Sequence, residues 1–250
     1  YGQSPFTIAL LHGGPGAAGE MKPVAEILSG KRGVLEFLQT ATSVDGQIEE
    51  LKKQILSVTA EPLIIVGYSW GAWLATLLSA RYPDRIKKLV LISSGAFDQK
   101  YNSDLLKVRL ERLTDSERQE AENILSNLNT VEVNDAHFAR FGELMTKADS
   151  YCLIDNKEDN VIIPNVEIYH KVWPEANELR RSGKLKEALS KIKCPITIIH
   201  GNYDPHPLDG ILKPLEELGK NYNLMLLEKC GHTPWKEKYA KDKFYDCLNS

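Results

Sequence analysis

A serine stands between two glycines in the segment "GYSWG", residues 67–71. The β-branched run "LIIV" precedes this segment, and a mostly apolar helical pattern follows it. In this context Gly-x-Ser-x-Gly forms a strained strand-to-helix turn that exposes the serine hydroxyl, while the glycines let neighbouring backbone pass close by. The pattern predicts that Ser69 is a nucleophile at the carboxyl end of a strand.

A serine nucleophile needs a general base to remove its proton, and that base needs a carboxylate to orient it. Asp204 closely follows the apolar run "ITIIHG", and His232 lies in a loop after the later run "NLMLLE". Serine, then acid, then histidine is the chain order found where the nucleophile sits on such a turn. We therefore predict a catalytic triad of Ser69, Asp204 and His232.

Other histidines compete for these roles. His206 lies two residues after Asp204, between two prolines, and we expect that a histidine so near cannot turn back against Asp204. It is interpreted as a residue of the loop or the rim of the site, with contact to substrate as the alternative. His200 ends a predicted strand, and His12 is expected to tie a glycine-rich loop to neighbouring backbone.

That glycine-rich loop is the segment "HGGPG", residues 12–16, which follows the first apolar run. Acyl-bond hydrolysis needs two N–H donors directed at the developing oxyanion, and loss of one donor lowers the rate about 100-fold or more. One donor is the backbone N–H of the residue after the nucleophile, here Trp70, and the second comes from a loop after a neighbouring strand. Gly13 and Gly14 are the candidates for the second donor, with Gly14 slightly preferred.

Short apolar runs indicate the strands that position these groups, and most are continuously apolar, as strands buried on both faces are. The runs span residues 6–11, 33–38, 63–67, 88–93, 196–201 and 223–228. Helical patterns between them span residues 21–29, 44–59 with Asp45 as a candidate cap, 70–83, 208–219 and 234–248. The alternation predicts an α/β fold, a mostly parallel sheet of about six strands with helices on both faces.

The alternation breaks between residues 98 and 192, where charge is high and no convincing strand is present. Helical patterns cover residues 103–128, 135–149 and 175–192, and the strand pattern resumes at Pro195. We interpret residues 98–192 as a helical cap inserted before the strand that carries the acid. Residues 1–97 and 193–250 then form the core domain.

Composition and charge narrow the classes of function. A net charge of −3 without a basic patch argues against nucleic acid or a membrane as partner. No apolar run approaches the roughly 18 residues of a membrane span, and the first residues lack the features of a signal peptide. The cysteines are scattered without a Cys-x-x-Cys pair, which favours reduced thiols in a cytoplasmic protein and no metal site. No feature of the sequence indicates an oligomeric state.

The motifs "HGGPG", "GYSWG", "HGNYD" and "CGHTPW" together resemble those of the α/β-hydrolase superfamily, in the same order and over nearly the whole chain outside the insertion. "HGGPG" with "SWG" looks most like the proline iminopeptidase branch, whose members remove an N-terminal proline from peptides. That branch also has a helical cap. The resemblance implies the α/β-hydrolase fold and a small molecule or short peptide as substrate.

In that branch, glutamates of the cap bind the free amino group of the substrate. The segment "WPEANELRRSG", residues 173–183, is loosely similar to one that carries such a glutamate, which implies Glu178 first and Glu175 second. An exposed helix face is the alternative for both. Tyr68 stands where the branch usually has a small residue and is a further candidate for substrate contact, and Pro205 stands where some relatives have an acid.

The sequence therefore predicts a serine hydrolase that acts on a small ester or amide through an acyl-enzyme, with no metal or cofactor. Cleavage of an N-terminal residue from peptides is the narrower form of this prediction. The alternative from another class is a catalytically silent small-molecule-binding protein that keeps the hydrolase fold. A haloalkane-type hydrolase needs an aspartate nucleophile, which Ser69 disfavours.

Overall fold

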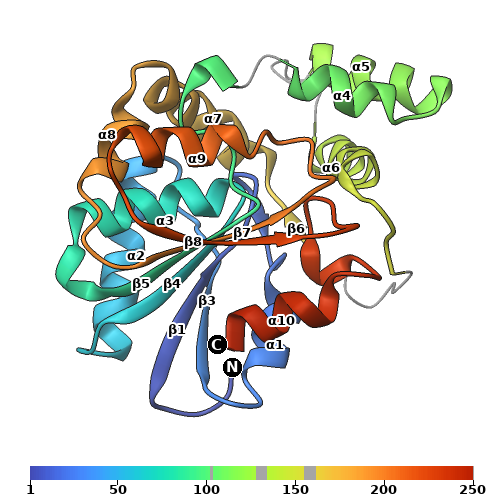
Figure 1. Ribbon diagram of the computed structural model, residues 1–250. Coiled ribbons are helices and arrows are strands. Elements are labelled where there is room, and N and C mark those ends of the chain that lie inside the picture. The colour runs from blue at the N-terminus through green and yellow to red at the C-terminus, as the bar shows by residue number, and fades with distance from the viewer. Residues whose placement is uncertain (102–103, 128–133, 155–161, 250) are drawn as a thin grey trace.

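The computed structural model describes residues 1–101, 104–127, 134–154 and 162–249. A parallel sheet with the strand order β3-β1-β4-β5-β7-β8 forms its centre (Figure 1). The strands are β1 (Phe6–Leu11), β3 (Gly33–Phe37), β4 (Leu63–Tyr68), β5 (Ile86–Ile92), β7 (Ile196–Gly201) and β8 (Tyr222–Leu227). The six predicted strands are confirmed, with ends displaced by two residues at most.

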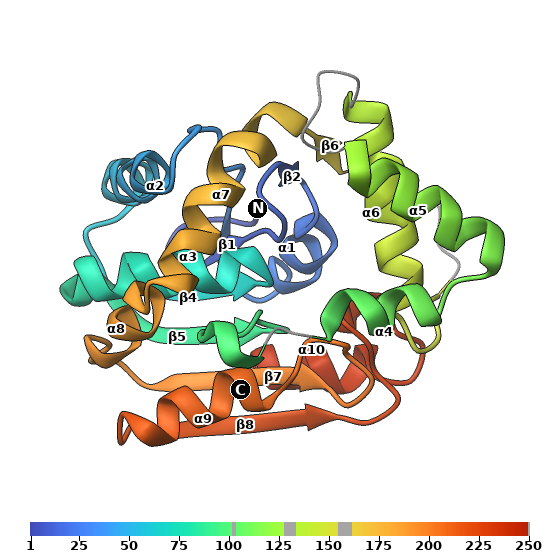
Figure 2. The same ribbon diagram turned by 90° about the horizontal axis from the view of Figure 1, so that it is seen from above.

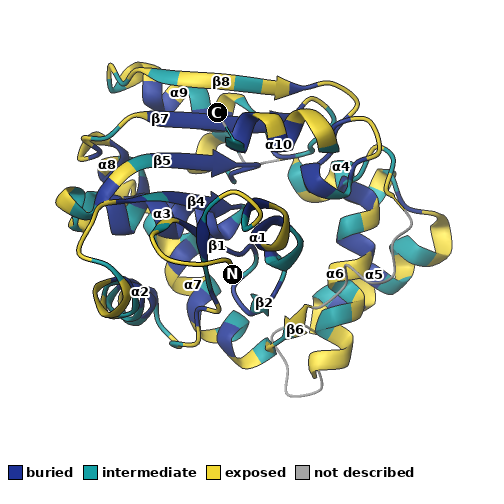
Figure 3. Cartoon of the chain, turned by 90° about the horizontal axis from the view of Figure 1, so that it is seen from below, coloured by how far each residue is buried: buried dark blue, intermediate teal, exposed yellow. Residues whose placement is uncertain are grey.

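Helices cover both faces of the sheet, because alternate side chains of each strand point to opposite sides. Ile65 and Leu89 join the hydrophobic cluster on one face, and Val66 and Val90 join the cluster on the other. The first face is covered by α2 (Val44–Val58), α3 (Trp70–Arg81) and α9 (Asp209–Glu217), and the second by α1 (Lys22–Leu28) and α10 (Lys241–Asn249). The central strands are buried, whereas the edge strand β8 is exposed over much of its length (Figure 3).

Outside the insertion, two predicted helix details are wrong. Ser43, not Asp45, caps α2: its hydroxyl accepts a hydrogen bond from the Gly46 N–H at 3.0 Å, whereas Asp45 lies inside the first turn and pairs with Arg81. The single helix expected over residues 234–248 is a 3₁₀ turn at Pro234–Lys236 followed, from Lys241, by α10. The helical pattern is interrupted where Glu237 turns a buried carboxylate toward backbone N–H groups of other segments.

The insertion contains α4 (Leu105–Glu111), α5 (Asp115–Asn127), α6 (Asp135–Asp149), α7 (Val166–Arg181) and α8 (Lys184–Ser190). The predicted stretch 103–128, whose two end residues lie outside the described residues, contains the two helices α4 and α5. The prediction for 175–192 is also wrong, because α7 begins at Val166 and Gly183, at φ +78°, separates it from α8. The helices α4, α5 and α6 share a small hydrophobic cluster, which the start of α7 also contacts. In contrast, most of the buried apolar side chains of α7 and α8 join the hydrophobic cluster on the sheet face that α2, α3 and α9 cover, beside α3 (Figure 2). The insertion therefore packs in two ways, and its division from the core at residues 98–192 stays a prediction.

A two-residue strand in the insertion holds the glycine-rich loop. The pair consists of β2 (Ala17–Ala18) and β6 (Ile163–Pro164), which run antiparallel. The Asn165 N–H also donates to the carbonyl of Gly16 at 2.9 Å. A Cβ at Gly16 would stand 2.2 Å from the carbonyl oxygen of Asn165, and φ there is +84°. Only glycine fits this contact, so the position of the loop depends on the insertion.

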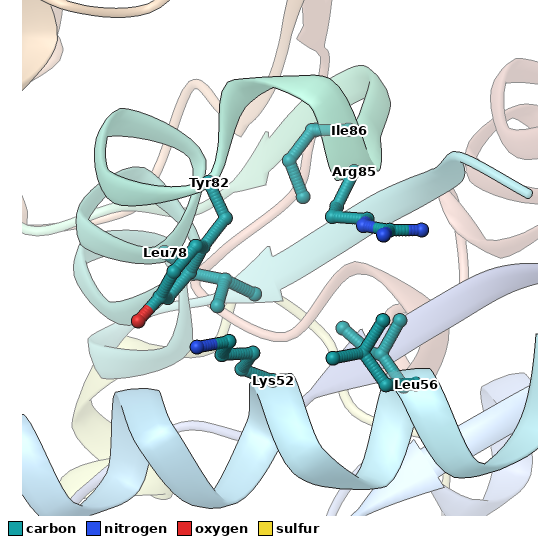
Figure 4. Close-up of a pocket in the computed structure, with 7 residues that line it drawn as sticks. Lys52, Leu56, Leu78, Tyr82, Arg85 and Ile86 are labelled. Atoms are coloured by element: carbon teal, nitrogen blue, oxygen red, sulfur yellow. The ribbon is translucent and has the colours of Figure 1, made fainter. Parts of the chain in front are cut away.

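A small cavity lies between α2 and the end of α3, lined by Lys52, Leu56, Leu78 and Tyr82 among others (Figure 4). Its volume of about 10 Å³ leaves room for one water molecule at most. The cavity lies near Ile86, where β5 begins, so it is at the amino ends of the strands. Ser69 follows the carboxyl end of β4, at the opposite edge of the sheet.

Candidate active site

Ser69 lies on a strained turn between β4 and α3. Its φ is +52° and its ψ is −113°, a conformation that costs a residue with a side chain about 1–3 kcal/mol and that is concentrated at functional sites. A Cβ at Gly67 would stand 2.1 Å from the carbonyl oxygen of Gly71, and one at Gly71 would stand 2.4 Å from that of Leu11. The two glycines of the motif are therefore required by close backbone packing around the serine.

The N-terminus of α3 meets this turn directly. Ser69 is the N-cap residue, but its side chain makes no cap hydrogen bond. The partial positive charge of the helix end consequently lies beside the hydroxyl. Trp70 is the first helical residue, and its backbone N–H is one of the groups that have no acceptor within a helix. The position suits an oxyanion donor, and that role of Trp70 stays a prediction.

His12 anchors the start of the glycine-rich loop. Its Nδ1 lies 2.8 Å from the carbonyl oxygen of Gly13, and its Nε2 lies 2.8 Å from that of Leu38, just after β3. The ring is fully buried, and this burial lowers the pKa of His12. The prediction that His12 ties the loop to neighbouring backbone is confirmed.

Glu20, which belongs to none of the sequence motifs, distinguishes between the two glycine candidates for the second oxyanion donor. Its Oε2 accepts a hydrogen bond from the Gly13 N–H at 3.1 Å. The Gly13 donor is thus already engaged, which leaves Gly14, at φ +39°, as the stronger candidate for the second oxyanion donor. Burial raises the pKa of the Glu20 carboxyl. A single glutamate in a segment without periodicity carries no signal that would have revealed this contact.

Asp204 and His232 come together across the carboxyl edge of the sheet. Asp204 follows β7 and His232 follows β8, and His232 Nδ1 lies 2.8 Å from Asp204 Oδ2. The Asp204 side chain has no exposed surface, and the His232 side chain is 8% exposed. The pairing expected from chain order is present although 28 residues separate the two positions.

The charges of this pair stabilise each other. Burial by itself raises the pKa of Asp204, but His232, His206 and His200 outweigh that effect and hold the pKa well below its ordinary value. Burial by itself lowers the pKa of His232, but the charge and the hydrogen bond of Asp204 raise the pKa above its ordinary value. The protonated form of His232 is thus stabilised, as a base that must carry a proton during a reaction requires.

His206 also binds Asp204, and the expectation that it cannot turn back against that residue is wrong. Both its backbone N–H and its ring Nδ1 lie 2.9 Å from Asp204 Oδ1. The physical reason is the aspartate side chain, which accepts the N–H two residues further on and so folds the loop into a local turn. The His206 ring then stacks on the His232 ring, with 4.2 Å between centroids and 19° between planes.

A family model described as the alpha/beta hydrolase fold matches residues 15–239. The chain belongs to this family. It is 23% identical to a proline iminopeptidase of Lactobacillus helveticus over 92% of this chain and 85% of that protein. It is 26% identical to human monoacylglycerol lipase ABHD6 over 80% of this chain and 58% of that protein.

A solved structure gives the same result for the fold. The crystal structure of VinJ superimposes with a TM-score of 0.70 at 17% identity, over 97% of this chain and 88% of that one. The resemblance to α/β-hydrolases, with proline iminopeptidases among the relatives, is confirmed. Within the part of this α/β-hydrolase that the structure describes, no helix has the length and apolar character needed to cross a membrane.

Tyr68 supports the histidine rather than lining an open surface in this α/β-hydrolase. Its side chain is buried, and its ring centroid lies 5.1 Å from that of His232 and 4.7 Å from that of Trp235. Its hydroxyl lies 3.0 Å from the Thr233 hydroxyl. The structure thus places Tyr68 in the packing around His232, and contact with substrate stays a prediction.

The two cap glutamates have other partners in the structure. Glu175 accepts a hydrogen bond from the Val44 N–H at 2.8 Å, at the start of α2. Glu178 is exposed and pairs with Arg181 on its own helix. Neither contact brings a carboxylate to the histidine pair, and binding of an amino group by these residues stays a prediction.

A partly buried ion pair from the insertion lies against the histidines. Arg109 of α4 donates to Asp149, the last residue of α6, through Nε at 2.7 Å and Nη2 at 2.5 Å. Asp149, His206 and His232 have ligand atoms within 4.8 Å of one another, a spacing that suits a metal ion. The guanidinium of Arg109 already supplies the positive charge there, and its Nη2 lies 3.5 Å from His206 Nε2. A helical pattern by itself places such charges on a solvated face, so this ion pair could not be predicted from the sequence.

The loop that carries His232 is bound to the end of α6. The His232 N–H donates to the Asp149 carbonyl at 2.9 Å. Glu237 Oε1 accepts from the Gly231 N–H at 2.8 Å and from the Tyr151 N–H at 2.8 Å, and its Oε2 accepts from the Cys152 N–H at 2.7 Å. One buried carboxylate therefore joins the insertion to the histidine loop.

Replacing Glu237 by glutamine should destabilise the protein, because an amide NH₂ then faces a backbone N–H that has lost its acceptor. We expect the free energy of unfolding, measured by urea denaturation, to fall by about 2–3 kcal/mol. The control is Glu122→Gln on the exposed side of α5, which should change it by less than about 0.5 kcal/mol. Equal stability of the two variants would contradict the bridging role of Glu237.

Proposed function

We propose that this α/β-hydrolase is a serine hydrolase that cleaves a small carboxylic ester or amide through an acyl-enzyme. The observation that carries the proposal is the buried 2.8 Å contact between His232 and Asp204 at the edge of the sheet where the strained Ser69 turn also lies. Nucleophile, base and orienting acid then follow the ends of three different strands, the arrangement typical of a serine on such a strand-to-helix turn.

In the acylation step, His232 Nε2 accepts the hydroxyl proton of Ser69 while Oγ bonds to the substrate carbonyl carbon. The carbonyl electron pair moves to oxygen, and the backbone N–H groups of Trp70 and Gly14 donate to that anion. The tetrahedral intermediate expels the alcohol or amine, which takes the proton from His232. Water then repeats the sequence on the acyl-enzyme and releases the acid and free Ser69.

Asp204 stays ionised throughout. It holds the Nδ1–H of His232, so that Nε2 is the nitrogen available to Ser69, and its charge stabilises the imidazolium that forms in each half of the reaction. The buried position of both residues strengthens this interaction relative to water.

A fluorophosphonate probe tests the nucleophile. The native protein should be labelled on Ser69, and Ser69→Ala should be unlabelled, because the probe bonds only to an activated hydroxyl. Mass spectrometry of the labelled peptide locates the adduct. Native protein that takes up no probe, or a Ser69→Ala variant that is labelled equally, would contradict the proposal. The alternative, a small-molecule-binding protein with a hydrolase fold, would then be favoured.

The pH dependence follows from the raised pKa of His232. Only the neutral ring accepts a proton, so kcat/KM for an uncharged ester should rise with pH through a pKa above the ordinary histidine value of 6.5. Asp204→Asn should lower kcat/KM by about 10⁴-fold. Asp209→Asn, which replaces an exposed carboxyl of the same segment, is the control and should leave the pH dependence of kcat/KM unchanged. A native acid limb below 6.5 would be inconsistent with the imidazolium-stabilising role of Asp204.

Removal of an N-terminal residue from short peptides is the narrower form of the proposal, supported by the similarity to the proline iminopeptidase of L. helveticus. Proline p-nitroanilide should then be cleaved faster than its N-acetyl form, because the free amino group is recognised. Glu178→Gln should raise KM for the free amine alone, and Glu122→Gln serves as control. Faster cleavage of the acetylated compound would reject the aminopeptidase form and retain the serine hydrolase.

A further inference from the structure

The carboxylate of Asp204 is shared between two histidines, one on each oxygen. Oδ2 receives His232 Nδ1 at 2.8 Å, and Oδ1 receives both the ring Nδ1 and the backbone N–H of His206 at 2.9 Å. The three side chains are less than 10% exposed. A triad needs only the first of these contacts, so the second calls for its own explanation.

The tautomer of the His206 ring follows from its neighbours. Its Nδ1 faces a carboxylate, which only accepts, so that nitrogen carries the proton. Its Nε2 faces Arg109 Nη2 at 3.5 Å, and a guanidinium only donates, so Nε2 is unprotonated. Burial, with the nearby charge of His232, lowers the pKa of His206 to about 4. The ring is therefore neutral near pH 7 and donates to Asp204 from one defined edge.

A neutral donor on Oδ1 has two effects on Asp204. It prevents rotation about the Cβ–Cγ bond, so that Oδ2 stays directed at His232. It also draws part of the carboxylate charge away from His232, which limits how strongly the imidazolium is stabilised. Because the two rings are stacked at 4.2 Å, a charged His206 would repel a protonated His232, and the neutral form avoids this repulsion.

We propose that His206 is a positioning residue for the reaction, which holds Asp204 in orientation and sets the basicity of His232, and that Arg109 of the insertion fixes the His206 tautomer. The inference rests on the proposed function for its kinetic consequence, but the hydrogen-bond geometry stands without it. The charged and titratable groups around the two rings include Arg109 of α4, Asp149 of α6, Tyr68 of β4, His200 of β7, the buried Glu20 that follows the glycine-rich loop, and Asp204.

Two variants test whether His206 acts through its hydrogen bond to Asp204 or only through packing. The amide nitrogen of asparagine reaches the position of the histidine Nδ1, so His206→Asn keeps a donor on Asp204 Oδ1. His206→Leu keeps a similar volume and has no side-chain donor, while the backbone N–H of residue 206 still reaches Oδ1. Loss of a hydrogen bond to a buried charge corresponds to a change of about 10- to 100-fold in a rate or equilibrium constant. We expect His206→Leu to lower kcat on p-nitrophenyl acetate by that factor with KM within about twofold, and His206→Asn to regain most of the loss.

The pH profile distinguishes positioning from packing. Without the ring donor, Oδ1 of Asp204 keeps only the backbone N–H of residue 206, so more of the carboxylate charge acts on His232. The acid limb of kcat/KM should therefore move to higher pH in His206→Leu and return toward the native position in His206→Asn. Equal losses in both variants, or an unmoved limb in His206→Leu, would overturn the proposal. If His206→Leu does not fold, His206→Gln takes its place, because its amide extends beyond the Nδ1 position.

Proton NMR of the His232 Nδ1–H separates this inference from the proposed function, since it requires no turnover. Titration of that resonance gives the pKa of His232 in native, His206→Leu and His206→Asn proteins. A higher pKa in the leucine variant alone supports the positioning role even in a protein that no fluorophosphonate labels. Identical titrations in all three proteins reject it, even if the native protein is an active serine hydrolase.

Discussion

The candidate site depends on one buried carboxylate. Asp204 has lost its contact with water, and an isolated ionised carboxylate in such a place would be expensive. Hydrogen bonds from two histidines compensate that cost and keep the group charged. The compensation in turn directs the two rings, because each donates through Nδ1 and presents Nε2 elsewhere. The orientation of the His232 base is thus a consequence of the solvation of Asp204.

The same constraint explains why the insertion takes part in the site. His206 Nε2 faces Arg109, and the charge of Arg109 is balanced by Asp149, so the chain of contacts runs from Asp204 into α4 and the end of α6. The backbone carbonyl of Asp149 and the carboxylate of Glu237 attach the His232 loop to the same segment, since both accept backbone N–H groups of that loop. Helix α4 and the end of α6 are therefore part of the framework that positions His232.

Much of the fold could be predicted because its signals are local. Strands buried on both faces leave continuous apolar runs, and each of the six was found within two residues. The triad candidates could be placed because chain order and strand ends determine which loops meet. Apolar periodicity does not predict that Ser43 rather than Asp45 caps α2, or that the helical pattern breaks before α10. Both features depend on side-chain hydrogen bonds, which periodicity does not report.

The sequence by itself determined the α/β-hydrolase fold, the Ser69 turn, and the candidacy of Asp204 and His232. Only the tertiary structure decided that His206 turns back onto Asp204, that Glu20 engages the Gly13 N–H, and that Arg109 and Asp149 lie against the histidines. The physical reason is that apolar periodicity reports burial along one element. The partner of a buried charge comes from another element, and only the packing of the chain brings the two together.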